Sequence, residues 1–205
     1  ADGEEMIERE RQLVEEILKF LRENCTDLDE IKLLAEARKG LEDLFLVVIC
    51  GEFNAGKSSV INAMLGDKFV AEGILPTTNE IAVLRYSSKK SREQTEDGFF
   101  NVGIPAELLQ QMRIVDTPGT NVILQRQQRL TEEFVPRADL VLFVLSADRP
   151  MTESEGKFLT YIRKWGKKVV FVVNKTDLLS DPGDVDEVVA FVKDNATRLL
   201  SVSDP

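Results

Sequence analysis

Histidine is absent from the 205-residue chain, and cysteine occurs at only two positions, Cys25 and Cys50. The lack of histidine excludes histidine-based catalysis and histidine ligands for a metal ion. Cys25 falls in a helix-like stretch and Cys50 in a strand-like stretch, so we interpret both as reduced thiols in a reducing compartment. No apolar run approaches the roughly 18 residues that a bilayer-spanning helix needs, and no secretory signal pattern is present.

Basic residues are in the minority. Lysine and arginine number 26 against 36 aspartates and glutamates, which gives a net charge of −10. Because contacts to phosphates need clustered Lys and Arg side chains, we expect no nucleic-acid partner and no direct binding of anionic lipid. Any contact with membrane lipid is then expected to come from segments outside this chain or from a partner.

The N-terminal segment 1–42 is predicted to be helical. An amphipathic helix is expected over 4–25, and a second helix is expected to begin near Thr26 and to end near Gly40. Either the two helices form a hairpin packed on the following domain, or they belong to a bundle that other helices complete. The apolar stripe of the first helix consists of Met6, Ile7, Leu13, Val14, Ile17, Leu18 and Leu21.

From residue 43 to residue 205, short apolar strands alternate with helical stretches, which predicts an α/β domain. We expect a mostly parallel central sheet with helices on both faces. Ligands of such sheets bind beyond the carboxyl ends of the strands. The expected strands are 44–50, 81–86, 112–116, 140–146 and 169–174, and the expected helices are 57–65, 131–137, 152–164 and 185–200.

The first motif runs from Gly51 to Ser58 and matches GxxxxGK[ST] between a predicted strand and a predicted helix. Its glycines allow backbone N–H groups to surround phosphates, and the helix N-terminus favours negative charge. Lys57 is expected to reach the β- and γ-phosphates, and the Ser58 hydroxyl to ligate Mg²⁺. The predicted nucleotide-binding residues of this loop are Glu52, Phe53, Asn54, Ala55, Gly56, Lys57, Ser58 and Ser59.

The second motif, Asp116-Thr117-Pro118-Gly119, ends another apolar strand. Asp116 is expected to hold Mg²⁺ through water, and the Gly119 amide to sense the γ-phosphate. Between the two motifs, Thr78 is expected to close over Mg²⁺ and the γ-phosphate, with Thr77 as the alternative.

The third motif, Asn174-Lys175-Thr176-Asp177, again follows a strand. The Asp177 carboxylate can accept hydrogen bonds from N1–H and from the exocyclic amine of guanine, a donor pair that adenine lacks. Asn174 and Lys175 are expected to brace this loop and the plane of the base. The three motifs together predict that this α/β domain is a P-loop GTPase domain, with GTP as substrate and GDP as product.

The order of the motifs resembles that of translation-factor-like GTPases. The stretches GEFNAGKSS (51–59) and PTTNE (76–80) are similar to those of bacterial dynamin-like proteins and mitofusins. DTPGTNVILQRQQ (116–128) and VLSADRP (144–150) with TESE (152–155) closely resemble the plastid fuzzy-onions-like proteins of plants and algae. These belong to the dynamin-like GTPase superfamily.

This resemblance implies the GTPase head of a membrane fusion or remodelling protein, next to helical bundles. It also implies a homodimer formed through the GTPase face, and a location at the chloroplast thylakoid or inner envelope membrane. In that family a further strand, with a Ser-Ala type loop over the guanine, follows the position of Leu200. We therefore expect the GTPase domain to be incomplete at its C-terminus.

The hydrolytic machinery is expected to comprise Asn54, Lys57, Thr78 and Gly119. Thr120 stands where small Ras-like GTPases carry a water-orienting glutamine. Asn54 lies three residues before Lys57, where potassium-activated GTPases have an asparagine that ligates K⁺, and it could hold such an ion against the phosphates. Alternatively, Asn54 only stabilises the loop by hydrogen bonds. Two other functions stay open: a K⁺-dependent regulatory or ribosome-assembly GTPase, and a GTP-binding fragment without hydrolysis.

Overall fold

The computed structural model describes residues 2–24, 44–52, 54–69, 81–96, 98–117 and 130–200. The chain divides into two compact units, Ala1–Leu44 and Phe45–Pro205. In the first unit, helix α1 spans Asp2–Asn24, close to the expected range 4–25. Leu18 on its apolar stripe is buried, whereas Leu13 and Phe20 are exposed. The expected second helix lies outside the described residues.

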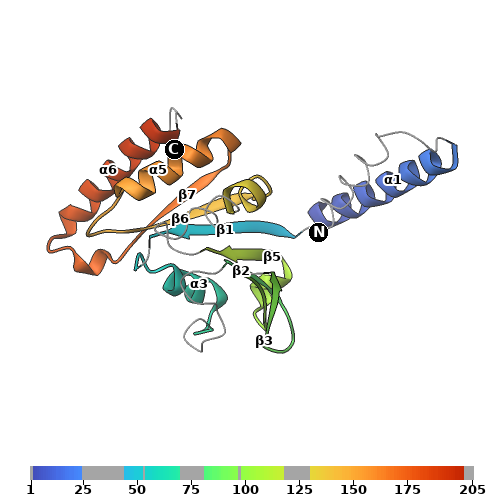
Figure 1. Cartoon of the computed structure of the whole chain (residues 1–205), viewed down its shortest axis with the longest axis horizontal. Coiled ribbons are helices and arrows are strands. Elements are labelled where there is room, and N and C mark those ends of the chain that lie inside the picture. Colours follow the sequence, from blue (N-terminus) through green and yellow to red (C-terminus); the bar gives the residue numbers. More distant parts are fainter. Residues whose placement is uncertain are drawn as a thin grey trace. The chain divides into compact units, whose positions relative to one another are not determined.

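The second unit contains the alternating strands and helices that its sequence predicts (Figure 1). No described helix in either unit is both long enough and apolar enough to cross a membrane. The strands are β1 (Phe45–Gly51), β2 (Ile81–Tyr86), β3 (Ser91–Glu96), β4 (Phe99–Ile104), β5 (Met112–Asp116), β6 (Leu140–Ser146) and β7 (Val169–Asn174). The α-helices are α3 (Lys57–Leu65), α5 (Glu153–Ile162) and α6 (Pro182–Leu200). The short helices are η2 (Glu107–Gln110), η3 (Leu130–Phe134), η4 (Arg163–Trp165) and η5 (Thr176–Leu178).

The seven strands form one sheet in the order β3-β4-β2-β5-β1-β6-β7. β1 pairs in parallel with β5 and with β6, and β6 pairs in parallel with β7. β2 runs antiparallel to β5, and β3 antiparallel to β4, while β2 and β4 are parallel. The predicted α/β fold with a mostly parallel sheet is confirmed, and β1, β5, β6 and β7 all end at the same edge.

Alternating side chains of β1 enter two separate cores, one on each face of the sheet. Val47 and Ile49 pack with Ile61 of α3. Val48 and Cys50 pack on the other face, with α5 and α6 residues that include Leu159. Helices therefore cover both faces, α3 on one and α5 with α6 on the other (Figure 1). These layers hold the carboxyl end of β1 in a rigid frame.

The structure contains two strands, β3 and β4, that the sequence analysis did not predict. The described part of β3 is exposed and polar from Ser91 to Thr95, so it carries no apolar alternation. It forms a solvated edge, where Arg92 lies over the ring of Phe100 at 4.2 Å and Arg85 pairs with Glu93 at 3.7 Å. β4 is largely buried and forms its sheet contacts with β2 and β3, which lie on either side of it.

Several helix ends also differ from the expected ones. The stretch expected as a helix over 131–137 is the π-helical turn η3, which covers Leu130–Phe134. α5 stops at Ile162 and tightens into η4 instead of continuing to 164. α6 begins at Pro182 rather than at 185, because proline is preorganised for the first helical turn and the Asp181 carboxylate accepts a hydrogen bond from the Gly183 amide at 2.9 Å.

Candidate nucleotide-binding site

The three sequence motifs meet at one edge of the sheet. Gly51 ends β1, Asp116 ends β5 and Asn174 ends β7, and these strands run parallel. The register pairs Ile49 of β1 with Asp116 directly. The predicted residues on these strand ends are therefore brought together, whereas Phe53, Thr77, Thr78 and Gly119 lie outside the described residues.

The loop from Gly51 to Gly56 depends on its two glycines. Gly51 has φ 147° and Gly56 has φ 91°, a region that disfavours side chains. A Cβ on Gly51 would lie 2.2 Å from the Val144 carbonyl oxygen, and one on Gly56 would lie 2.1 Å from Asn174 Nδ2. The backbone therefore approaches β6 and the third motif more closely than any side chain permits.

Lys57 closes the loop on itself. Its Nζ donates hydrogen bonds to the Gly51 carbonyl at 3.0 Å and to the Glu52 carbonyl at 3.1 Å. Burial lowers the pKa of Lys57, and the Asp116 carboxylate is the largest of the charges that oppose this shift. The ammonium group is thus held by backbone carbonyls at the carboxyl end of β1.

Asp116 is a half-buried acid, one of whose carboxylate oxygens is buried with unused hydrogen-bonding capacity. Its Oδ1 is buried and has no hydrogen-bond partner among the described residues. Burial raises the pKa of Asp116 to about 6, while the nearby Lys57 charge opposes the increase. Ser58 is exposed in the first turn of α3. A buried carboxylate oxygen without a partner and an exposed hydroxyl are oxygen ligands of the kind Mg²⁺ takes, so these two residues could hold it.

Asn174 joins the third motif to the first. Its Nδ2 donates to the Ala55 carbonyl at 3.0 Å, and its own backbone carbonyl accepts from the Ala147 amide at 2.8 Å. The side chain therefore ties the third motif to the loop between β1 and α3. Lys175 has φ 61°, and Asp177 is exposed in η5, open to a ligand.

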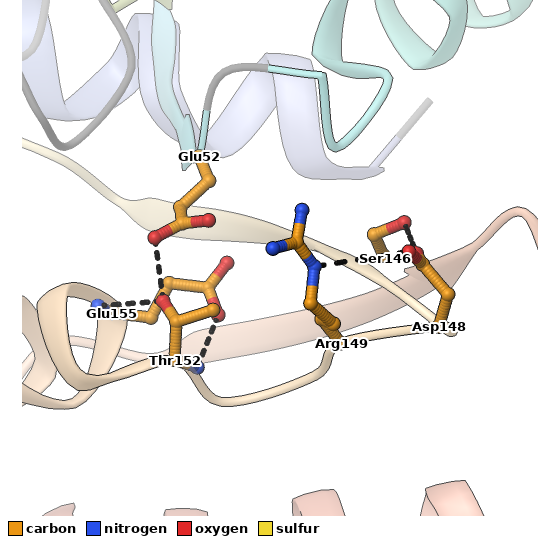
Figure 2. Close-up of polar contacts among 6 residues, drawn as sticks. All are labelled: Glu52, Ser146, Asp148, Arg149, Thr152 and Glu155. Atoms are coloured by element: carbon orange, nitrogen blue, oxygen red, sulfur yellow. Dashed lines mark hydrogen bonds and ion pairs between the residues drawn. The ribbon is translucent and has the colours of Figure 1, made fainter.

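The β6–α5 loop borders the same site. Asp148 accepts a hydrogen bond from the Ser146 hydroxyl and lies 3.9 Å from Arg149 Nε (Figure 2). The Ser146 hydrogen bond lowers the pKa of Asp148, and the charges of Arg149 and Lys175 add to the decrease. Met151 has φ 58°. In the part of the chain that the structure describes, Asn54, Met151 and Lys175 are the non-glycine residues with positive φ, and all three lie in loops at this edge.

Sequence reasoning did not assign a role to several residues of this site. Thr117 is buried and donates its hydroxyl to the Ile49 carbonyl at 2.8 Å, which ties the end of β5 to β1. Thr152 and Ser154 both donate to Glu52 (Figure 2). The signal that could have located Thr152 is the capping-box pattern that it forms with Glu155.

The family of the chain follows from comparison with known proteins. Residues 46–175 match the profile of the 50S ribosome-binding GTPase family. The chain belongs to this GTPase family. Its resemblance to fuzzy-onions-like proteins is also confirmed: an Arabidopsis thaliana protein named "Probable transmembrane GTPase FZO-like, chloroplastic" is 50% identical over 201 residues. That match covers 96% of this chain and 22% of the plant protein.

Other GTPases of bacteria are more distant. The tRNA modification GTPase MnmE of Campylobacter curvus (strain 525.92) is 30% identical over 170 residues, or 81% of this chain and 34% of that protein. A solved structure of an oligomerised bacterial dynamin pair superposes with a TM-score of 0.65 at 20% identity and covers 96% of this chain and 36% of its own. The structure of LeoA, a bacterial dynamin GTPase from ETEC, superposes with a TM-score of 0.56 at 25% identity. That match covers 97% of this chain and 36% of the LeoA chain. The chain therefore spans between about a fifth and a third of the lengths of these proteins.

Proposed function

We propose that the chain is the GTP-binding and GTP-hydrolysing head of a dynamin-like membrane fusion or remodelling protein. The observation that carries the proposal is the 50% identity with the FZO-like GTPase across 96% of the chain. The family is one of GTPases, so conversion of GTP to GDP and phosphate is the expected reaction. The chloroplast is the proposed location, at the thylakoid or inner envelope membrane, and lipid is contacted through segments outside this chain.

In this proposal Lys57 and the amides from Glu52 to Ser59 bind the phosphates, and Asp177 reads guanine. Its exposed carboxylate supports this role, because it is free to pair with the two guanine donors. Ser58, Asp116 and Thr78 would hold Mg²⁺, which supplies neutralisation of phosphate charge when bound. The Gly119 amide would sense the γ-phosphate.

Potassium is proposed as a second cation, held in part by Asn54. Asn54 is exposed in the phosphate loop with φ 68°, a conformation that asparagine tolerates better than most residues. A cation there would offset the charge that develops on the phosphates, and two heads meeting across their nucleotides would enclose it. If K⁺ stimulates Asn54→Ala as strongly as the parent, this role is wrong.

The test of the proposed function is GTP turnover against protein concentration in KCl and in NaCl, with Lys57→Ala as the blank. Specific activity that rises with concentration and requires K⁺ would support a cation-assisted homodimer of heads. Turnover that is absent at all concentrations, in a chain that binds GTP, would instead favour a non-hydrolysing GTP-binding fragment.

A regulatory or ribosome-assembly GTPase is the second candidate. The description of the matching family and the 30% identity with MnmE favour it. The net charge of −10 disfavours an RNA partner, because RNA binding wants a basic face. Stimulation of turnover by ribosomal particles, without dependence on protein concentration, would support this candidate over the first.

A further inference from the structure

Glu52 is an acidic residue in a loop that would surround phosphates, and its carboxylate is engaged elsewhere. Oε1 of Glu52 accepts a hydrogen bond from the Thr152 hydroxyl at 2.6 Å and another from the Ser154 hydroxyl at 2.5 Å. The donors are 100 and 102 residues away in the chain and lie at the start of α5. Figure 2 shows the Glu52 side chain pointing from the phosphate loop toward this helix start.

The helix start that holds Glu52 is itself well fixed. Thr152 is the N-cap of α5: its hydroxyl accepts from the Glu155 amide at 3.4 Å, and its own amide donates to Glu155 Oε2 at 2.9 Å. The Ser154 hydroxyl lies 3.2 Å from the Thr152 hydroxyl. Both donors therefore sit on a rigid first turn, with their hydroxyl groups directed at one carboxylate oxygen.

The backbone of Glu52, unlike its side chain, contacts Lys57, the lysine proposed to bind phosphate. Its carbonyl accepts from Lys57 Nζ at 3.1 Å and from the Ala55 amide at 3.2 Å. If the Glu52 carboxylate were released while its carbonyl stayed on Lys57, the side chain would place a negative charge beside the bound polyphosphate. Like charges at such short range repel each other strongly where the surroundings are only partly solvated.

We infer that Glu52 is a positioning residue for nucleotide binding, held by a clamp that consists of the Thr152 and Ser154 hydroxyls. The clamp keeps the carboxylate on α5 and away from the phosphates, while the Glu52 carbonyl stays on Lys57. This inference rests on the proposed function, because it requires a guanine nucleotide in the loop. If the clamp is removed, nucleotide binding should weaken because of the Glu52 charge, and it should weaken more for GTP than for GDP.

The experiment compares Thr152→Val/Ser154→Ala in two backgrounds, the parent chain and Glu52→Gln. Kd values for GTP and GDP are measured at low and high salt. With Glu52 present, loss of both donors should raise the Kd about tenfold for GTP, or about 1.4 kcal/mol, and about threefold for GDP, with a smaller effect at high salt. In the Glu52→Gln background, where the side chain has no charge, both changes should stay under about twofold.

Thr160→Ala is the matched control. Its hydroxyl donates to the Gly156 carbonyl within the same helix, at 2.9 Å, and it is exposed. This variant should leave both Kd values unchanged. If the double variant fails to fold, Ser154→Ala alone keeps the capping box intact and should raise the GTP Kd about threefold in the parent but not in the Glu52→Gln background.

Equal losses in the parent and in the Glu52→Gln background would overturn the clamp, since they would indicate a structural effect without a charge effect. No loss in either background would overturn it as well. Both results leave the proposed function standing as long as the parent binds GTP. A parent chain that binds no guanine nucleotide would overturn the proposed function, and the clamp with it.

Discussion

Gly56 joins the phosphate loop to α3, and its replacement by alanine tests the geometry of the site most directly. The new Cβ would lie 2.1 Å from Asn174 Nδ2 and 3.4 Å from its Cγ. Non-bonded atoms do not approach this closely, so the Asn174 amide must move. Its hydrogen bond to the Ala55 carbonyl, 3.0 Å long, would then be lost, and the third motif would no longer brace the first.

Two costs add up in Gly56→Ala. Alanine at φ 91° costs roughly 1–2 kcal/mol of backbone strain. Loss of the partly buried Asn174 hydrogen bond costs roughly 1–3 kcal/mol more. Gly66, at the other end of α3, separates the two: it has φ 79°, and a Cβ there would meet nothing within 4 Å. Gly66→Ala should therefore carry only the strain.

The assay measures the free energy of unfolding by urea denaturation and the Kd for a fluorescent GDP analogue in both variants. Gly66→Ala should lose about 1–2 kcal/mol of stability from strain, and Gly56→Ala should lose about 1–3 kcal/mol more through the broken Asn174 hydrogen bond. Only Gly56→Ala should also bind GDP more weakly, by a factor of roughly 5 to 150, as 1–3 kcal/mol converts. Adding Asn174→Ala to Gly56→Ala should cause little further loss, because Gly56→Ala has already broken the hydrogen bond from Asn174 to the Ala55 carbonyl.

Equal GDP affinities in Gly56→Ala and Gly66→Ala would refute the reasoning. They would mean that the Asn174 contact has no part in shaping the phosphate loop. A full further loss in the double variant would refute it too, because it would show that the Asn174 hydrogen bond survives beside alanine.

The Cys50 thiol, whose pKa burial raises to about 12, should react with an alkylating agent at pH 8 about a thousandfold more slowly than an exposed thiol, measured in a Cys25→Ser background to report on Cys50 alone. Urea should restore the ordinary rate; fast labelling of the folded chain would contradict this. Asp177→Asn should weaken GDP binding about 100-fold, through roughly 3 kcal/mol of lost pairing, and favour xanthine nucleotides in a competition assay. An unchanged base preference would place guanine elsewhere. Thr117→Val should lower the free energy of unfolding by about 1 kcal/mol, because the hydrogen bond from the hydroxyl to the Ile49 carbonyl is lost. An unchanged free energy of unfolding in urea denaturation would argue against that bond.

The parts of the fold that follow from the sequence are those with local signals. The apolar runs of β1, β6 and β7 are read directly from their residues, and GxxxxGK[ST] places Lys57 at the start of α3. The strand β3 has no such signal, because Ser91–Glu96 is polar and gains its structure from pairing with β4. A solvated edge strand is specified by its neighbour rather than by its own pattern.

The candidate site divides in the same way. The strand ends predict that Gly51, Asp116 and Asn174 meet, and the sheet register brings them together. The bond between Glu52 and Thr152 joins residues 100 positions apart, so no short motif announces it. The roles of the predicted site residues all stay predictions, and Thr78 and Gly119 lie outside the described residues.

The positive φ angles of Asn54, Met151 and Lys175 indicate where the folded protein should unfold locally first. Strain is expected mainly at Met151 and Lys175, because asparagine tolerates this conformation. Strained backbone persists only while its surroundings hold it, so these loops should open at a lower free energy than the two cores. On warming, amide hydrogens at the ligand edge should exchange with solvent before those of β1 and β6. Bound nucleotide, by contacting several of these loops, should then slow hydrogen exchange over a region larger than the residues it touches.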